Sequence, residues 1–156
     1  MPENSVNPDR RKILSASVSA AVSVFFGGGV FADTHSIRDA IEEYTGGNPA
    51  DSSDTLVLKT PKIAENGHSV AVSVSMASPM TPDDYVESVM IFAEENPNPE
   101  VAIFHFSPLS GEAGVSTRIR LARTQHVIAI AKLSDGSLHK VTNFVEVTVG
   151  GCGADV

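Results

Sequence analysis

Hydrophobic positions recur first with helical spacing and then with the spacing of β-strands. Over residues 37–44, apolar residues three and four positions apart form one face, which predicts a short amphipathic helix. Ser36 is a favourable N-cap for this helix, and Gly46-Gly47 ends it. Residues 48–55 are polar and predict a linker or loop before the first strand.

From residue 56 onward, several stretches have apolar residues at every second position, which indicates strands with one buried face. Other stretches are apolar on both faces, as is typical of central strands. Turn signals rich in Asn, Gly, Pro and Asp separate them. The sequence therefore predicts a mainly β fold, an immunoglobulin-like antiparallel β-sandwich with a short N-terminal helix and a flexible C-terminal arm. The alternating stretches are 70–76, 115–122 and 141–149, those apolar on both faces are 86–93, 100–107 and 126–133, and a short piece at 56–58 adds a seventh.

Residues 1–32 carry the features of an export signal. A basic stretch with paired Arg10 and Arg11 precedes a weakly apolar segment that ends in small residues at Ala32. The paired arginines indicate the twin-arginine route. The apolar segment is alternatively a retained membrane anchor, although glycines and serines weaken it as a spanning helix. We therefore expect a twin-arginine signal peptide at 1–32, a helix plus β-sandwich domain at 33–149, and a flexible carrier arm at 150–156.

Composition and charge exclude several classes of function. The chain of 156 residues has a net charge of −8, and without the signal it keeps 8 basic and 17 acidic residues, a net charge of −9. This charge repels nucleic acids, and aromatic residues for base stacking make up only 6%. The single cysteine excludes an intrachain disulfide and a zinc site built from several cysteines. Arg118, Arg120 and Arg123 form a small basic stripe that is either exposed or faces an acidic partner.

Histidines and paired carboxylates give little indication of chemistry. His105, inside an apolar stretch, is better explained as a satisfied core or interface residue than as a metal ligand. The adjacent pairs Asp83-Asp84 and Glu94-Glu95 are typical of solvated turns. No phosphate-binding glycine loop or serine-nucleophile motif is present. The histidines, which show no metal-ligand spacing, are His35, His68, His105, His126 and His139.

The predicted arm holds the one nucleophile that stands out. Cys152 follows the last predicted strand by three residues, with Gly150 and Gly151 before it and Gly153 after it. A lone cysteine is usually buried as a small hydrophobe, but flanking glycines favour a slender, mobile chain. Two or three extended residues span roughly 7–10 Å, enough to thread a narrow channel in another protein. The nearest charges in sequence are Asp155 and the terminal carboxylate, so we expect a partner's electropositive pocket to deprotonate the thiol.

The arm and several stretches before it resemble the SoxY family, the sulfur-carrier subunits of the thiosulfate-oxidising Sox multienzyme system. The Gly-Gly-Cys-Gly sequence at 150–153 directly follows Val145-Glu146-Val147-Thr148-Val149. The family's motif usually ends Gly-Gly-Cys-Gly-Gly, whereas here Ala154-Asp155-Val156 follows Gly153. The added bulk and carboxylate would either hinder entry into a tight channel or mark a divergent paralogue. Further similar stretches lie at 58–67, 95–99 and 116–120, and the twin-arginine leader fits as well.

The resemblance implies a noncatalytic periplasmic carrier with no cofactor besides covalent sulfur adducts. Cys152 matches the family's attachment residue, and Gly150, Gly151 and Gly153 match its flexible surround. The implied partner is SoxZ, another β-sandwich protein, in a heterodimer. A SoxAX cytochrome would join thiosulfate to the thiol, the SoxB hydrolase would release sulfate, and a SoxCD sulfane dehydrogenase, where present, would oxidise the remaining sulfur. Neither a nucleic-acid partner nor a membrane contact after processing is expected.

Two other interpretations of the cysteine stay open. In the first, the chain is an exported β-sandwich binding module whose Cys152 forms an interchain disulfide. In the second, it is a thiol oxidoreductase, which is weakened by the lack of a resolving cysteine and of a cation nearby in sequence. Intact mass separates carrier from bridge, because sulfur adducts lost on reduction indicate a carrier and a doubled mass alone indicates a bridge.

Overall fold

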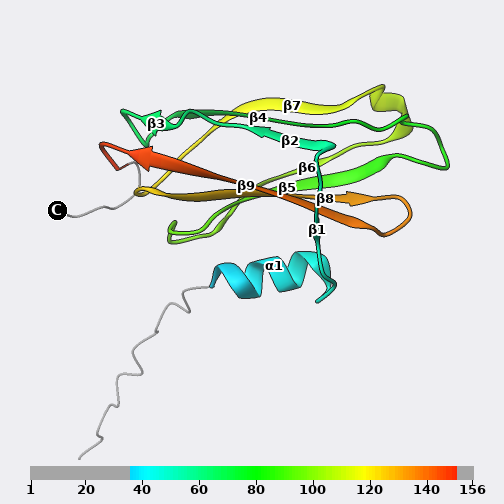
Figure 1. The fold of residues 1–156 in the computed structure, drawn as a ribbon, viewed down its shortest axis with the longest axis horizontal. Coiled ribbons are helices and arrows are strands. Elements are labelled where there is room, and N and C mark those ends of the chain that lie inside the picture. The colour runs from blue at the N-terminus through cyan, green and yellow to red at the C-terminus, as the bar shows by residue number, and fades with distance from the viewer. Residues whose placement is uncertain (1–35, 151–156) are drawn as a thin grey trace, which may run out of the picture. The chain divides into compact units, whose positions relative to one another are not determined.

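The computed structural model describes residues 36–150, which form a helix and a β-sandwich (Figure 1). The predicted export signal, with Arg10, Arg11 and His35, lies outside the described residues. Among the described residues, no helix has the length and apolarity needed to cross a membrane. The elements are α1 Ile37–Thr45, β1 Asp51–Ser52, β2 Leu56–Lys59, β3 Ile63–Ala64, β4 Val70–Met76, β5 Val86–Ala93, β6 Glu100–His105, the 3-10 helix η2 Pro108–Ser110, β7 Ala113–Ile119, β8 Gln125–Leu133 and β9 Leu138–Val147.

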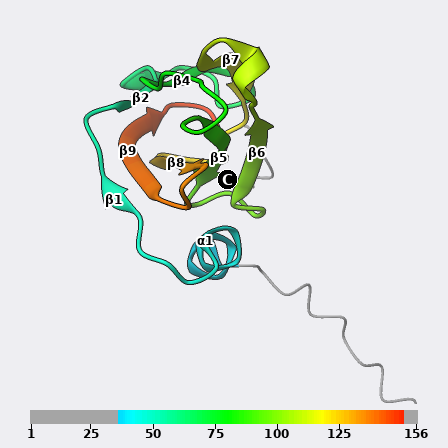
Figure 2. The ribbon, with the colours of Figure 1, turned by 90° about the vertical axis from the view of Figure 1, so that its right-hand side faces the viewer.

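The strands form two sheets that face each other. The larger sheet has the order β1-β9-β8-β5-β6, with β3 also paired to β9, and the smaller sheet has the order β2-β4-β7. β9 and β1 stand on one side of the sandwich, and β6 and β7 on the opposite side (Figure 2). The predicted β-sandwich is therefore confirmed, with one departure. The short strands β1 and β3 run parallel to β9, whereas the longer strands pair antiparallel.

Alternating side chains fill the space between the sheets. On β4, Val72 and Val74 are buried in the core, whereas Ala71 on the other face is exposed. β5 is buried on both faces, because Val89 points into the core between the sheets and Phe92 packs under α1 on the outside. The apolar pattern of 86–93 thus reflects its central position, as predicted.

The helix begins, ends and docks as its sequence predicts. The Ser36 hydroxyl accepts a hydrogen bond of 3.3 Å from the backbone N–H three residues on, and Gly46 ends the helix with a left-handed φ of 64°. The Tyr44 ring lies edge-on to Phe92, with 6.0 Å between ring centroids. The Tyr44 hydroxyl is 2.8 Å from the buried Ser88 hydroxyl. Tyr44 therefore fastens α1 to the outer face of β5 by apolar and polar contacts together.

Two local expectations are wrong. Residues 48–55 are not only a linker, because β1 lies within them, and the sequence did not predict β3. The stretch 100–107 is not a central strand, since β6 ends two residues earlier and pairs with β5 alone within the described residues. Its apolar pattern has two sources: Phe104 and Phe106 contact the core, whereas Ile103 on the other face remains 45% exposed.

Candidate functional site

β9 is the strand that leads to the predicted arm. It pairs along its length with β8 and, on its other edge, with β1 near its start and β3 at its end. Val145, close to that end, is completely buried. Gly150 is the one predicted arm residue that the structure describes, and Gly151, Cys152 and Gly153 lie outside the described residues. The described part of the candidate site is therefore the segment 147–149, here called the arm root.

Side-chain and backbone bonds hold the first half of the arm root. The Val147 N–H donates to the Thr124 hydroxyl oxygen at 2.9 Å, and that hydroxyl is 3.4 Å from the Val147 carbonyl oxygen. The Thr148 N–H donates to the Ala64 carbonyl at 3.0 Å. Thr124 precedes β8, so its side chain extends the contact with β9 beyond the strand pairing. The sequence alone does not indicate Thr124, because a threonine before a strand carries no signal of its own.

A loop from the other sheet holds the second half of the arm root. The Gly67 N–H donates to the Val149 carbonyl at 2.7 Å, and the Gly67 carbonyl accepts from the Leu121 N–H at 2.8 Å. Gly67 is buried, whereas the Val149 side chain is 57% exposed. Among the described residues, the anchoring bonds reach as far as Val149, three positions before Cys152. The sandwich thus fixes where the arm starts.

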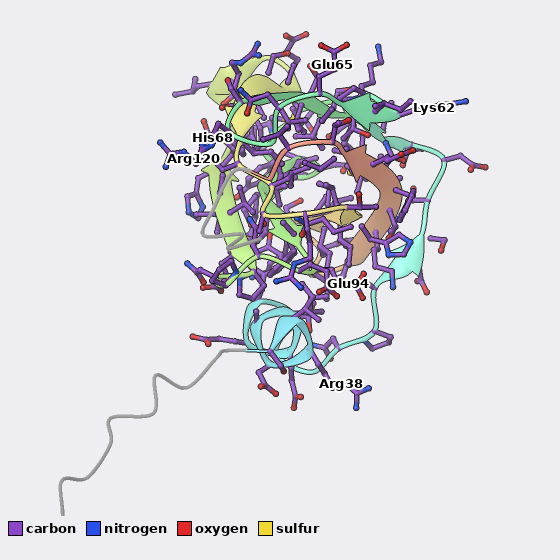
Figure 3. The ribbon with its side chains drawn as sticks, turned by 90° about the vertical axis from the view of Figure 1, so that its left-hand side faces the viewer. Arg38, Lys62, Glu65, His68, Glu94 and Arg120 are labelled. Atoms are coloured by element: carbon purple, nitrogen blue, oxygen red, sulfur yellow. The ribbon has the colours of Figure 1, made fainter. Side chains whose placement is uncertain are left out.

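Charged side chains gather at this end of the sandwich. His68 and Arg120 directly adjoin the residues that bracket the arm root, and both are exposed, next to one another in Figure 3. Lys62 and Glu65 lie toward the smaller sheet in the same view. Arg120 and Lys62, together with the acidic Glu65, therefore come from distant parts of the sequence to this end of the sandwich. The predicted basic stripe is exposed in the chain, although Arg118 donates to the Ser69 carbonyl at 2.9 Å and Arg123 lies 3.8 Å from the Glu95 carboxylate.

The histidines do not form a metal site in the described part of the chain. His126 bonds to the Glu94 carboxylate at 2.7 Å and stacks edge-on against Phe144, with 5.3 Å between centroids. His105 is exposed, so it is not a core residue. His139 has a buried Nδ1 atom without a hydrogen-bond partner. No group of three or more His, Cys, Asp or Glu side chains positioned to hold a metal ion occurs within residues 36–150.

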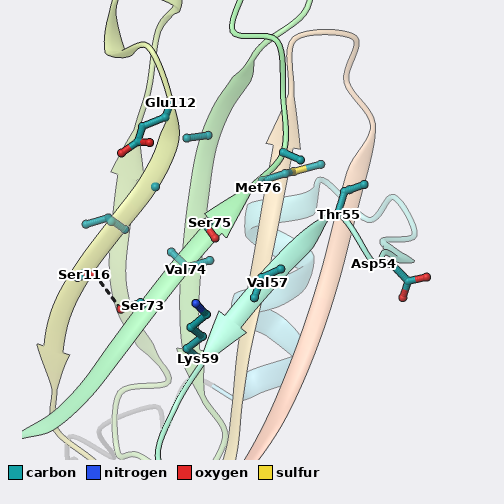
Figure 4. A pocket seen from close by; sticks show the side chains of 14 residues that line it. Asp54, Thr55, Val57, Lys59, Ser73, Val74, Ser75, Met76, Glu112 and Ser116 are labelled. Carbon is teal, nitrogen blue, oxygen red and sulfur yellow. Dashed lines mark hydrogen bonds between the residues drawn. The ribbon is translucent and has the colours of Figure 1, made fainter.

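A groove of about 840 Å³ crosses the outer face of the smaller sheet (Figure 4). Small and polar side chains line it, and the hydroxyls of Ser73 and Ser116 are 2.8 Å apart across β4 and β7. Lys59 stands at one side and Glu112 at the far end (Figure 4). In the described residues, no histidine lines the groove to activate these serines. The groove is a surface for contacts and offers no nucleophile paired with a base.

Two groups with shifted pKa values lie away from the arm root and have structural causes. Burial raises the pKa of Tyr44, while the hydrogen bond from Ser88 lowers it and the nearby Glu87 charge raises it. The side-chain and backbone hydrogen bonds of Ser137 lower the pKa of Asp135 in the turn between β8 and β9. Both shifts arise from local structural contacts. In the described residues, the sandwich thus holds the end of β9 in place. The candidate reactive atom remains the thiol of Cys152.

Comparisons with known proteins agree with this geometry. The profile of the family described as sulfur oxidation protein SoxY matches residues 41–152. The sulfur carrier protein SoxY from Chlorobium limicola f thiosulfatophilum superposes with a TM-score of 0.61, at 32% identity over 72% of this chain and 96% of its own. No curated protein sequence matches the chain.

More distant structures share the fold alone. A superoxide reductase (neelaredoxin) from Ignicoccus hospitalis has a TM-score of 0.54 at 17% identity, over 60% of this chain and 79% of its own. A putative superoxide reductase from Thermotoga maritima has a TM-score of 0.55 at 19% identity, over 63% of this chain and 93% of its own. Both are under a quarter identical to this chain, so neither transfers an activity to it.

The sandwich and its matched C-terminal strand define a sulfur-oxidation protein of the carrier class. The profile covers more than half of the chain and ends at the single cysteine. The chain belongs to the SoxY family. Its role is that of a sulfur-oxidation carrier working with the Sox system.

Proposed function

We propose that the chain is a periplasmic carrier that binds thiosulfate-derived sulfur covalently on Cys152 and presents it to Sox enzymes. One observation supports this most strongly: the family match ends at Cys152, while the sandwich anchors the chain as far as Val149. Gly150 and Gly151 separate the last anchor from the thiol, so the reactive sulfur is tethered to a fixed point by a short glycine segment.

The carrier chemistry balances with the partners that we propose. The Cys152 thiolate and thiosulfate join into a thiosulfonate by losing two electrons, which the SoxAX cytochrome accepts. Water, with the SoxB hydrolase, then cleaves the bond between sulfur and the sulfonate group. This releases sulfate and two protons and leaves a persulfide on Cys152. A SoxCD sulfane dehydrogenase, where present, oxidises the outer persulfide sulfur to a sulfonate on Cys152: water supplies the oxygen atoms, protons are released, and the dehydrogenase accepts the electrons. The chain itself serves as a noncatalytic covalent carrier without a cofactor.

The positive charge of Arg120 beside the arm root supports this function. Thiosulfate, the thiosulfonate adduct and the thiolate are all anions, and a thiolate is favoured near positive charge. His68 and Arg120 lie beside the anchors of the arm root, so they adjoin the place where the arm starts. In the sequence, Asp155 is the charged side chain nearest to the thiol. The charges of Arg120 and Asp155 act across solvent, so salt screens them.

Export completes the proposed function. Residues 1–32 act as a twin-arginine signal peptide with Arg10 and Arg11 as its recognition pair, and cleavage after Ala32 releases the helix and sandwich. The twin-arginine route carries folded cargo, which suits a subunit that assembles with SoxZ before export. In the periplasm, a lone thiol in an oxidising compartment is available for sulfur chemistry.

The test is intact mass spectrometry of the chain, purified without reductant from cells exposed to thiosulfate. We expect mass increments of sulfur and of thiosulfate that disappear on reduction and are missing in Cys152→Ser and Cys152→Ala. Both variants should lose thiosulfate-dependent activity in a reconstituted system while still binding SoxZ. A doubled mass as the one reducible species would identify an interchain disulfide instead, and normal turnover by either variant would refute the assignment.

A further inference from the structure

β6 is an open strand edge on the side of the sandwich away from the arm strand. Within the described residues it pairs with β5 alone, and the Phe106 N–H directly after it still donates to the β5 residue Glu87 at 2.9 Å. Backbone groups alternate in direction along an antiparallel strand, so those of Phe104 also face β5. The N–H and C=O groups of Ile103 and His105 therefore face away from the sheet.

The opposite side of the sandwich is closed. β1 and β3 pair with the outer edge of β9, and the Asn143 amide on β9 donates to the Leu58 carbonyl on β2 at 2.8 Å. These contacts lace the two sheets together there. On the open side, β6 and β7 stand as the outer strands of their sheets (Figure 2). The molecule therefore presents one side that is suited to pairing with another strand.

The open edge is apolar along most of β6, although Glu100 stands at its start and the pairing of β6 with β5 is irregular between Ile91 and Phe92. Isolated edge strands are normally guarded by lysine, proline or inward-pointing charges, because a bare edge pairs with other chains. The β6 sequence, from Glu100 to His105, has no lysine or proline and reads as a strand covered on both sides. Ile103 is 45% exposed, and Leu109 on the adjoining η2 is 98% exposed. This is the composition of a strand that has a neighbour.

The charge around this edge indicates what kind of neighbour fits. No lysine or arginine lies on β6, on η2 or in the loops that flank them over residues 94–112. Glu94 and Glu95 in this segment pair with His126 and Arg123, whereas Glu100 on β6 and Glu112 before β7 form no ion pair with the described residues. A second copy of this chain would bring acid against acid. A different chain with basic residues beside its edge strand would be attracted.

We propose that β6, with η2 beside it, is the docking edge for a strand of a different, basic β-sandwich subunit. The larger sheet would then continue across the interface, with the Ile103 and His105 backbone groups bonded to the partner strand and Leu109 covered by it. This inference rests on the proposed function in one respect, because the heterodimer partner SoxZ serves as the test protein. The interface lies on the side of the sandwich away from β9, so partner enzymes would have access to the arm.

The test measures binding of purified SoxZ to the full mature chain carrying Ile103→Lys or, as a matched control, Val57→Lys. Val57 is 40% exposed on β2 and lines the groove of the smaller sheet, so both variants place a similar charge on similarly exposed strands. We expect Ile103→Lys to weaken binding about tenfold or more, because its charge repels a basic partner, and Val57→Lys to leave binding near wild type. Leu109→Lys, in a side chain outside the core, should weaken binding too and serves if Ile103→Lys fails to fold.

Amide hydrogen exchange distinguishes strand pairing from other docking. On binding SoxZ, the N–H groups of Ile103 and His105 should become protected, whereas Phe104, already bonded to β5, should change little. Weakening by Val57→Lys alone would place SoxZ on the smaller sheet and overturn the proposal, as would self-association of the chain through β6. Failure of SoxZ to bind the wild-type chain would overturn it as well. Sulfur adducts on Cys152 in the same preparation would show that the carrier function nevertheless stands.

Discussion

Thr124 tests whether the sandwich fixes the start of the arm. Its hydroxyl accepts from the Val147 N–H at 2.9 Å and lies 3.4 Å from the Val147 carbonyl. Thr124→Val keeps the shape of the side chain and removes both contacts. The shorter bond is worth about 1 kcal/mol net, and the longer one adds little because water can replace it at this exposed position.

A loss of about 1 kcal/mol corresponds to a roughly fivefold larger population of the detached arm root. If the bonds at Thr148 and Val149 open together with that at Val147, exchange of the Thr148 N–H should accelerate by about fivefold. The midpoint of thermal unfolding should fall by about 4 °C. Amide hydrogen exchange by NMR and a thermal melt measure the two effects.

Thr142→Val is the matched control, because Thr142 is exposed on the same strand and its side chain makes no hydrogen bond to the described residues. This variant should exchange and melt like the wild-type chain. Equal exchange at Thr148 in the two variants would refute the idea that Thr124 holds the arm root. Alkylation of Cys152 in both variants shows whether a looser root also alters access to the thiol.

Three further predictions concern the arm, the helix and the closed side of the sandwich. Replacing Gly151 and Gly153 with proline should slow sulfur transfer without changing the melting midpoint, and unchanged transfer rates would mean that arm flexibility is unimportant. Burial raises the pKa of Tyr44 from its ordinary value of 10.0, so its neutral form stabilises the fold fully below that pH, and the contribution is lost as pH rises through the raised value. Melts between pH 9 and about 11.5 should thus show a steeper alkaline loss for wild type than for Tyr44→Phe, even though Tyr44→Phe costs about 1 kcal/mol at neutral pH by leaving Ser88 unpaired. Asn143→Ala should destabilise the chain by about 1–2 kcal/mol in urea unfolding, because it leaves a backbone carbonyl of β2 without its partner; a change below 0.5 kcal/mol (about the scatter of a surface substitution) would contradict this.

The fold was largely predictable because most of its elements carry their own signal. The period of two over 70–76 and the uniform apolarity of 86–93 correspond to β4 and β5 at the residues expected. The strands β1 and β3 were not predictable, because a strand of two residues is too short to show a periodic pattern. The edge position of β6 was not predictable for a different reason. The hydrophobic pattern of a strand shows which faces are apolar but not what covers them.

The reactive residue of the candidate site was predictable from the sequence. The residues that hold the arm root were not, because they are distant from it in the sequence. Cys152 and its glycines follow from composition and order alone. The anchors Thr124 and Gly67 come from loops that only the folded chain brings to Val147 and Val149. The same holds for the charged side chains at the arm root, because residues far apart in the chain share that end of the sandwich.

The pairing of β9 on both edges has a mechanical consequence for a tethered cargo. If the chain carries sulfur on Cys152 as proposed, a partner enzyme that holds the sulfur while the sandwich is held elsewhere would pull lengthwise along β9. The hydrogen bonds between β9 and β8 run perpendicular to that direction, and β3 pairs with the last two residues of β9 on its other edge. Under such a load the hydrogen bonds of β9 share the force and would have to break together. The arm with its bound sulfur would therefore leave a partner's active site before β9 detaches from the sandwich.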